Sequence, residues 1–170
     1  MIVALTGFMA SGKSYFGRKA ARRCGLHFAD LDLEMAERSG YGSVNAIVSH
    51  EGMETFRAFE TEVLSQLLGE ERDMLLSLGG GTVLAPVNRE MLRQRARVIW
   101  LDTDLEVIMM RMNPAIRPVA AGKSRQELEE LYGERRPVYE ACADAVLHIG
   151  ADDSADDIVQ RLAALVRSFI

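Results

Sequence analysis

The sequence predicts an α/β domain in which a parallel β-sheet is covered by helices on both faces. Five short apolar segments, each long enough for one buried strand, alternate with segments whose apolar residues recur at helical spacing. No internal repeat, linker or low-complexity segment interrupts this alternation. Strands that alternate with helices form parallel sheets, because each crossover helix packs on a face of the sheet. We therefore expect a single domain over residues 1–170.

The amino-terminal segment carries the motif around which the chain is organised. Residues 1–6 are apolar and predict a buried strand, and residues 7–14 (GFMASGKS) follow it directly. These eight residues match the phosphate-loop pattern G-x-x-x-x-G-K-[ST] at every fixed position. The polar, alanine-rich segment that follows predicts a helix ending at Gly25. Strand, loop and helix thus occur in the order that lets backbone N–H groups and a helix N-terminus hold phosphate oxygens.

The phosphate loop predicts a site for a nucleoside triphosphate. Lys13 is expected to reach the β- and γ-phosphates, and the Ser14 hydroxyl to ligate Mg²⁺. A strand-to-helix turn that merely carries glycines is the alternative, and the full match in this context makes it the weaker interpretation. The candidate nucleotide-binding residues of this segment are Gly7, Ala10, Ser11, Gly12, Lys13, Ser14 and Tyr15.

The remaining strands and helices are predicted from apolar runs and from capping residues. The predicted strands cover residues 26–30, 73–78, 97–101 and 145–149. The predicted helices cover residues 33–38, a short stretch after Ser43, a longer stretch after Gly52, 86–94, a stretch after Asp104, 126–143 and a stretch after Ser154. Residues 112–124 follow no period, and Gly133 and Pro137 are positions where the helix over 126–143 could bend.

Composition limits the function classes. With 48% hydrophobic and 26% charged residues the chain reads as a soluble globular protein, and no apolar stretch is long enough to span a membrane. The first strand leaves no room for a signal peptide, and Cys24 and Cys142 lack metal-ligand spacing, so we expect free thiols in the cytoplasm. A net charge of −5 argues against a nucleic-acid partner. Since the expected ligand is anionic, the positive charge must be concentrated at the site, which predicts clustered arginines.

Two further segments fall at the carboxyl ends of predicted strands, where ligands bind in parallel sheets. Asp30 and Asp32 stand next but one, so both would face one side if the strand continued. A carboxylate there can hold the waters of Mg²⁺ or take the proton of an acceptor hydroxyl, and one of the two can also cap the next helix. Residues 79–81 are all glycine, which lets backbone N–H groups touch a ligand, although such a stretch can also be only a turn.

Arg57 and Glu60 are one helical turn apart and are flanked by Phe56 and Phe59. An exposed pair of this kind is worth little. Beside an apolar face, however, it can be a positioned guanidinium aimed at a carboxylate.

These motifs together resemble the shikimate kinase family from end to end. The phosphate loop alone is widely shared, whereas the combination of Phe-Arg-x-x-Glu, triple glycine and Arg-x-Pro-x-Tyr is close to specific. The matching segments are residues 7–14, Asp30-x-Asp32, Gly52-x-x-x-Phe56-Arg57-x-x-Glu60, Gly79-Gly80-Gly81, Arg117-Pro118 and Arg135-x-Pro137-x-Tyr139. Several features depart from the family: Ala10 replaces a third loop glycine, Tyr15 follows Ser14 where Thr is common, and the segment 111–117 is one residue shorter than usual.

The resemblance implies ATP- and Mg²⁺-dependent phosphorylation of the 3-hydroxyl of shikimate by a monomer, in the biosynthesis of chorismate and aromatic amino acids. It implies the three-layer fold of the nucleoside monophosphate kinases, with five parallel strands in the order 2-3-1-4-5. A small lid would lie at about residues 112–124 and an acceptor-binding helical region at about residues 31–62.

On the nucleotide side, the resemblance implies that Lys13 and Arg117 act on the phosphates, with Arg117 closing from the lid. Arg111 would lie against the adenine. Ser14 would ligate Mg²⁺, and Asp30 would stand behind a Mg²⁺-bound water.

On the acceptor side, the resemblance implies that Asp32 binds the shikimate hydroxyls and acts as the catalytic base. Arg57 and Arg135 would clamp the carboxylate, and Glu60 would orient Arg57. The glycines at 79–81 would contact the ring, through the Gly80 backbone in particular. Arg136 adjoins Arg135, and either guanidinium could face the substrate, although the spacing to the following proline and tyrosine favours Arg135.

Two alternatives remain open. A kinase of the same architecture could act on another small acceptor, such as gluconate or a nucleoside monophosphate. The arginine pair and Asp32 favour a polyhydroxy acid, because a monophosphate would need more phosphate-binding groups. The second alternative is a non-catalytic ATP-binding module, which would leave the carboxylate clamp without a purpose.

Overall fold

The computed structural model describes residues 1–112 and 123–170. In these residues five strands form one parallel sheet in the order β2-β3-β1-β4-β5, which confirms the predicted architecture and order. The strands are β1 (Ile2–Thr6), β2 (His27–Asp30), β3 (Met74–Ser77), β4 (Arg97–Thr103) and β5 (Ala145–Ile149).

The helices occur where periodicity and caps predicted them. They are α1 (Lys13–Cys24), α2 (Leu31–Ser39), α3 (Val44–Leu68), α4 (Pro86–Arg95), α5 (Leu105–Arg111), α6 (Arg125–Cys142) and α7 (Ala155–Arg167), with a short 3₁₀ turn η1 (Thr82–Leu84). The predicted break at Gly52 is a non-helical residue inside α3, with φ 83° and ψ 167°. The helix α6 runs through Gly133 and Pro137 without interruption.

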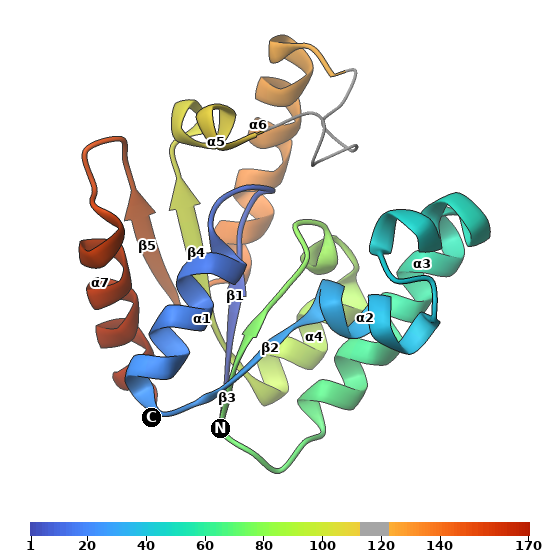
Figure 1. Ribbon diagram of the computed structural model, residues 1–170, viewed down its shortest axis with the longest axis horizontal. Coiled ribbons are helices and arrows are strands. Elements are labelled where there is room, and N and C mark those ends of the chain that lie inside the picture. The colour runs from blue at the N-terminus through green and yellow to red at the C-terminus, as the bar shows by residue number, and fades with distance from the viewer. Residues whose placement is uncertain (113–122) are drawn as a thin grey trace.

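The alternation of side chains along the strands divides the core into two layers. Val3 and Leu5 of β1 face a cluster formed with α1 and α7, whereas Ile2 and Ala4 face a larger cluster on the opposite side of the sheet. That second cluster takes buried residues from α2, α3, α4 and α6, among them Leu64 and Leu92. The sheet is therefore covered on both faces, and Figure 1 shows α1 and α7 together on one side of it.

The carboxyl ends of β1, β2 and β3 lie at one edge of the sheet, because the three strands are parallel and neighbouring. Beyond them lie the phosphate loop, the start of α2 and the triple glycine. At this edge β2 does not continue to Asp32, which was the condition for both carboxylates to face one side, because Asp30 caps a helix that begins at Leu31. The Asp30 carboxylate accepts hydrogen bonds from the backbone N–H groups of Asp32 and Leu33, so the alternative capping role is confirmed.

Within residues 1–112 and 123–170, no helix is both long enough and apolar enough to cross a membrane. Both thiols are free, and burial raises the pKa of each, which keeps Cys24 and Cys142 protonated at neutral pH.

Candidate active site

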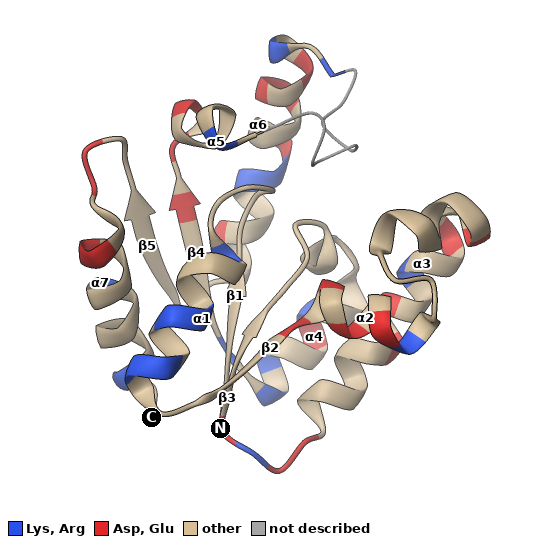
Figure 2. Cartoon of the chain, viewed as in Figure 1, with Lys and Arg blue, Asp and Glu red and all other residues tan. Residues whose placement is uncertain are grey.

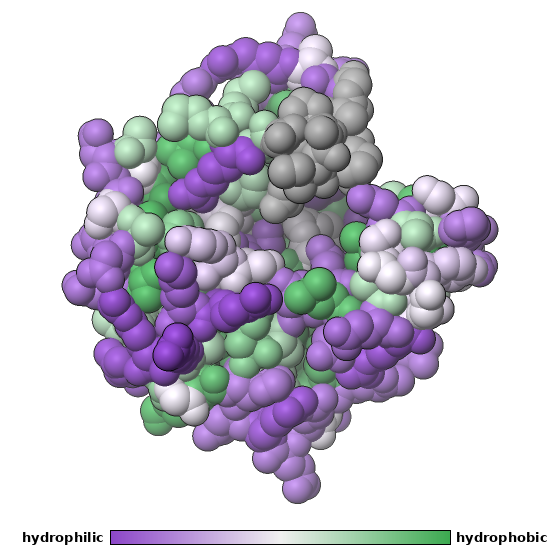
Figure 3. Space-filling view, viewed as in Figure 1, coloured by the Kyte–Doolittle hydropathy of each residue, from purple (hydrophilic) through white to green (hydrophobic). Residues whose placement is uncertain are grey.

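A cavity of about 840 Å³ opens at the carboxyl edge of the sheet. Figure 3 shows the surface hollowed between the lobe formed by α2 and α3 and the body of the molecule. The cavity is continuous from the phosphate loop to the first half of α3. Predicted site residues that line it are Ala10, Gly12, Lys13, Ser14, Tyr15, Asp32, Arg57, Gly79, Gly80, Gly81, Arg111 and Arg135.

The phosphate loop holds its lysine in place with its own backbone. Lys13 Nζ donates to the carbonyl oxygens of Gly7 at 2.7 Å and Phe8 at 2.9 Å, and the side chain is buried. Ala10, at the position where the resemblance expected glycine, adopts a left-handed conformation with φ 57°. That conformation costs an alanine about 1 kcal/mol, so the loop keeps its curvature at a small expense in stability. The loop thus presents a buried ammonium group at the cavity wall.

Three oxygen-bearing side chains meet beside the loop, where α1 begins. The Ser14 hydroxyl donates to the Asp30 carboxylate and lies 3.3 Å from the Ser77 hydroxyl. Hydroxyl and carboxylate oxygens are the ligands that Mg²⁺ prefers, and this ion keeps most of its waters when it binds phosphates. No group of three or more His, Cys, Asp or Glu residues in the described part of the chain could hold a metal alone. The donor set therefore fits Mg²⁺ held jointly with the phosphates of a nucleotide.

Arg111 forms the wall at the α1 end of the cavity. Its guanidinium donates to the Ser11 carbonyl at 3.2 Å and lies 5.3 Å from the centre of the Phe16 ring. Burial lowers the pKa of Arg111 from its usual value, yet an arginine stays charged at neutral pH. Tyr15 stands next to this wall, largely exposed and edge-on to Phe16. A flat cation and an aromatic ring side by side can accommodate the base of a nucleotide.

Arg57 stands at the opposite end, on the second half of α3. Its Nη1 donates to Glu60 Oε1 at 2.6 Å, and its guanidinium lies 5.2 Å from the centre of the Phe56 ring. Glu60 is 1% exposed, whereas the Arg57 side chain is 34% exposed. The pair therefore differs from an ordinary surface ion pair: a buried carboxylate holds a guanidinium that lines the cavity.

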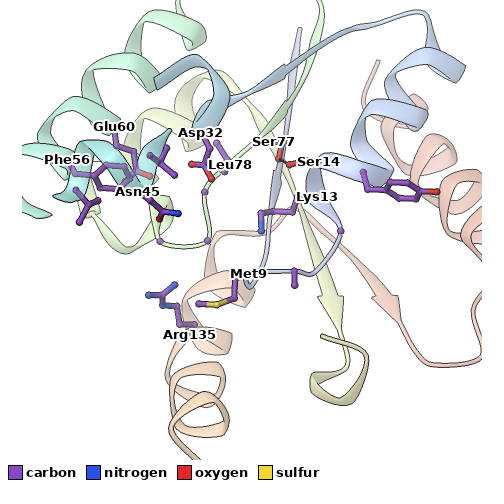
Figure 4. Close-up of a pocket in the computed structure, with 18 of the residues that line it drawn as sticks. Met9, Lys13, Ser14, Asp32, Asn45, Phe56, Glu60, Ser77, Leu78 and Arg135 are labelled. Carbon is purple, nitrogen blue, oxygen red and sulfur yellow. Dashed lines mark hydrogen bonds between the residues drawn. The ribbon is translucent and has the colours of Figure 1, made fainter. Parts of the chain in front are cut away.

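Asp32 lies in the first turn of α2, between the two ends of the cavity. Figure 4 shows its carboxylate beside the loop at residues 78–81. A carboxylate that can accept a proton thus lies beside Gly79, in the same cavity as Arg57 and Lys13.

The neighbours Arg135 and Arg136 of α6 have different surroundings. Arg135 lines the cavity and lies close to Gly80, whose carbonyl accepts a hydrogen bond from the Tyr139 hydroxyl at 2.6 Å. Arg136 instead pairs with Asp102 of β4 and stacks 5.0 Å from the centre of the Trp100 ring. The structure therefore places Arg135, and not Arg136, at the cavity.

The site concentrates positive charge in a protein of net charge −5, as the sequence predicted. Lys13, Arg57, Arg111 and Arg135 come from four helices and all line one cavity. Figure 2 shows basic residues on α1, α5 and α6 around the phosphate loop, while acidic residues colour much of α2. A low-dielectric cleft with this charge attracts anionic ligands.

Some predicted site residues do not line the cavity. Gly7 and Ser11 are buried in the loop beneath it, and Asp30 lies behind Ser14. Arg117 lies outside the described residues, as does most of the segment expected to form the lid.

Sequence reasoning missed several lining residues, which are Met9, Val44, Asn45, Val48 and Met53. Most are apolar residues in amphipathic helix patterns, and such residues cannot be told apart from core residues by spacing. Phe56 was named as a flank of Arg57 and as part of the Phe-Arg-x-x-Glu motif but not as a site residue, and here it forms part of the wall. Asn45 has no motif around it, and only its position on α3 brings it to the cavity.

The phosphate loop lies at the edge of a parallel sheet with the strand order 2-3-1-4-5. Arg57 and Arg135 line the same cavity and form a second set of side chains that can bind an anion. This arrangement defines a phosphate-loop kinase that acts on a small acceptor. The family model described as shikimate kinase matches residues 9–167. The chain belongs to the shikimate kinase family.

Similarity to individual relatives extends over nearly the whole chain. A shikimate kinase of Geobacter sulfurreducens is 40% identical over 168 residues, covering 97% of this chain and 90% of the relative. A shikimate kinase of Methylococcus capsulatus is 38% identical, covering 98% and 93%. The structure of a shikimate kinase from Acinetobacter baumannii in complex with shikimate superposes with a TM-score of 0.87 at 31% identity, covering 99% of this chain and 93% of that one.

Proposed function

We propose that this protein transfers the γ-phosphoryl group of ATP to the 3-hydroxyl of shikimate. The observation that carries the proposal is that Arg57, Arg135 and Asp32 share one cavity with an intact phosphate loop. The similar Acinetobacter baumannii enzyme was solved with shikimate, an acid that bears hydroxyl groups. Two guanidiniums and a carboxylate complement a substrate of that chemistry.

The acceptor is bound through its carboxylate. Arg57 and Arg135 stand on two helices and lie beside the adjacent glycines Gly81 and Gly80, and each offers charge-assisted donors to a carboxylate. Asp32 hydrogen-bonds the acceptor hydroxyls and takes the proton of the attacking one, because it lines the same cavity as the two arginines and the phosphate loop. The remote carboxylate thereby orients the reacting hydroxyl.

The phosphates are bound by the loop backbone and Lys13. The positive charge of Lys13 offsets the negative charge that develops on the phosphate oxygens during phosphoryl transfer. Ser14 and Asp30 would hold Mg²⁺ and its waters, and the ion would neutralise the phosphate oxygens. Arg111 packs against the adenine. Arg117, which is not among the described residues, stays a predicted contributor of positive charge to phosphate binding. That the protein acts as a cytoplasmic monomer stays a prediction.

The function is tested by ADP release with ATP, Mg²⁺ and a panel of acceptors. Shikimate should stimulate release strongly, whereas quinate, gluconate and nucleoside monophosphates should do so weakly or not at all. Lys13→Ala should fold and lose most of this turnover, which separates catalysis from a contaminating activity. Stimulation by gluconate in place of shikimate, or no stimulation by any acceptor, would reject the proposal.

A further inference from the structure

We propose that Thr82 and Asn88 are positioning residues for the acceptor, which act through Glu60 on the guanidinium of Arg57. Neither residue lines the cavity. The inference rests on the proposed function, because it assigns them a part in binding the carboxylate of shikimate.

The two oxygens of the Glu60 carboxylate have separate partners. Oε1 accepts from Arg57 Nη1 at 2.6 Å, and Oε2 accepts from the Thr82 hydroxyl at 2.8 Å. Since Glu60 and Thr82 are 1% and 0% exposed, solvent cannot replace either bond. The Thr82 hydroxyl therefore leaves only one carboxylate oxygen facing Arg57.

Asn88, the third residue of α4, fixes Thr82 in turn. Its Nδ2 donates to the Thr82 carbonyl at 2.8 Å, and its Oδ1 accepts from the hydroxyl of Thr61 on α3 at 2.8 Å. Asn88 is 0% exposed, so its amide is desolvated and its orientation is determined by these two bonds. The chain of contacts closes on α3, one residue after Glu60, which makes it a rigid ring between α3, η1 and α4.

The ring also touches the triple glycine. A β-carbon at Gly79 would stand 3.0 Å from Thr82 Oγ1, 3.1 Å from Asp32 Oδ1 and 3.2 Å from Glu60 Oε2. Three polar groups thus surround Gly79. Asp32 contacts this glycine directly, and Arg57 is linked to it through Glu60. Thr82 sits where the acceptor end and the catalytic centre of the cavity meet.

Loss of the Thr82 hydroxyl has a definite consequence for Arg57. Glu60 Oε2 would be left buried without its donor, which is costly for a carboxylate. The guanidinium of Arg57 already donates to the other oxygen and has a planar fork of donors, so the carboxylate would turn to engage it with both oxygens. The guanidinium would then tilt away from the acceptor carboxylate while the nucleotide half of the site stayed unchanged.

The test compares Thr82→Val, which keeps the shape and loses the hydroxyl, with Thr82→Ser, which keeps the hydroxyl. Thr82→Val should raise the KM for shikimate about tenfold, the size expected for a charged hydrogen bond lost indirectly, with the KM for ATP unchanged. Thr82→Ser should stay within about twofold of the wild type. Thr82→Ala should behave as Thr82→Val does, and it serves if the valine variant does not fold.

Thr6→Val is the matched control, because the Thr6 hydroxyl is buried and has no hydrogen-bond partner among the described residues. It should leave both KM values unchanged. In an Arg57→Ala background, Thr82→Val should add no further rise in the KM for shikimate, since the hydroxyl acts through that arginine.

Equal changes in both KM values, an unchanged KM for shikimate, or additive effects with Arg57→Ala would each overturn the inference. If the wild type itself showed no shikimate-dependent ADP release, the proposed function would fail instead.

Discussion

The guanidinium of Arg57 lies against the α-carbon of Gly81. A β-carbon at position 81 would stand 2.9 Å from Arg57 Cζ and 3.0 Å from Nη1, and closer still to Nη2. The backbone of Gly81 has φ −105° and ψ 0°, which any residue can adopt. Glycine is therefore required here for the space it leaves to an arginine, and not for its backbone freedom.

This relationship makes Gly81→Ala a test of the acceptor site. The added methyl group meets the far end of a flexible side chain, so we expect the guanidinium to move and the fold to persist. The KM for shikimate should rise by about ten- to a hundredfold, because one of two carboxylate-binding groups is displaced, while the KM for ATP stays nearly constant. Steady-state kinetics with each substrate varied in turn measures both.

Gly133→Ala supplies the control for a glycine-to-alanine change. Gly133 lies inside α6, and a β-carbon there meets nothing within 4 Å. This variant should keep both KM values and gain about 0.5–1 kcal/mol in free energy of unfolding, because alanine favours a helix interior. If Gly81→Ala also left the KM for shikimate unchanged, Arg57 would not be a ligand of the acceptor.

The adjacent arginines of α6 allow a second matched comparison. Arg135→Lys should raise the KM for shikimate about tenfold, because an ammonium group lacks the planar fork that grips a carboxylate. Arg136→Lys should leave that KM unchanged and lower the free energy of unfolding, since Arg136 pairs with Asp102 and stacks on Trp100. The reverse pattern would exchange the roles assigned to the two residues.

The methyl ester of shikimate refines this comparison. The wild type should prefer the free acid, and Arg135→Lys should lose most of that preference. Arg136→Lys should retain it.

Substitutions of Asp30 and Asp32 should affect two different steps, because we assign metal binding to Asp30 and proton transfer to Asp32. Asp30 bonds to Ser14 and caps α2, so Asp30→Asn should raise the Mg²⁺ concentration needed for half-maximal rate and also reduce stability. Asp32→Asn should lower kcat by a large factor with little change in the KM for ATP, because the amide cannot accept the proton. A Mg²⁺ titration of the rate measures the first effect, and saturation kinetics measure the second. Opposite outcomes would show that the two roles are reversed.

The order of elements and the phosphate loop were predictable because both depend on local signals. Apolar runs marked all five strands, and Gly52 marked the break in α3. The helix after β2 begins at Leu31, two residues before its predicted start, since a carboxylate such as Asp30 can extend a strand edge or cap a helix, and only tertiary context decides between them.

Contacts between residues distant in sequence could not be predicted in the same way. Thr82 and Asn88 match no motif. Thr82 nevertheless donates to Glu60, which lies 22 residues earlier in the sequence, and Asn88 of α4 donates to the Thr82 carbonyl. The spacing to Pro137 and Tyr139 favoured Arg135 over Arg136 only through the family resemblance, and it is the phase of α6 that turns Arg135 to the cavity and Arg136 to Asp102.

The last prediction concerns alkaline pH and the buried Tyr139. Its hydroxyl donates to the Gly80 carbonyl at 2.6 Å, and the residue is 1% exposed. Burial raises the pKa of the phenol above its usual value of 10.0, although the nearby charge of Arg135 opposes that rise. Folding therefore favours the protonated phenol.

The stability that this phenol contributes is fully present below about pH 10 and is lost as the pH rises through the higher pKa of the folded state. Tyr139→Phe should be less stable than the wild type at pH 7 by about 1 kcal/mol, because the carbonyl of Gly80 loses its donor. Above pH 10 the difference should shrink, since phenylalanine has no proton to lose. Urea denaturation of both proteins from pH 7 to pH 11 measures the difference, and a constant gap over that range would show that Tyr139 does not titrate with unfolding.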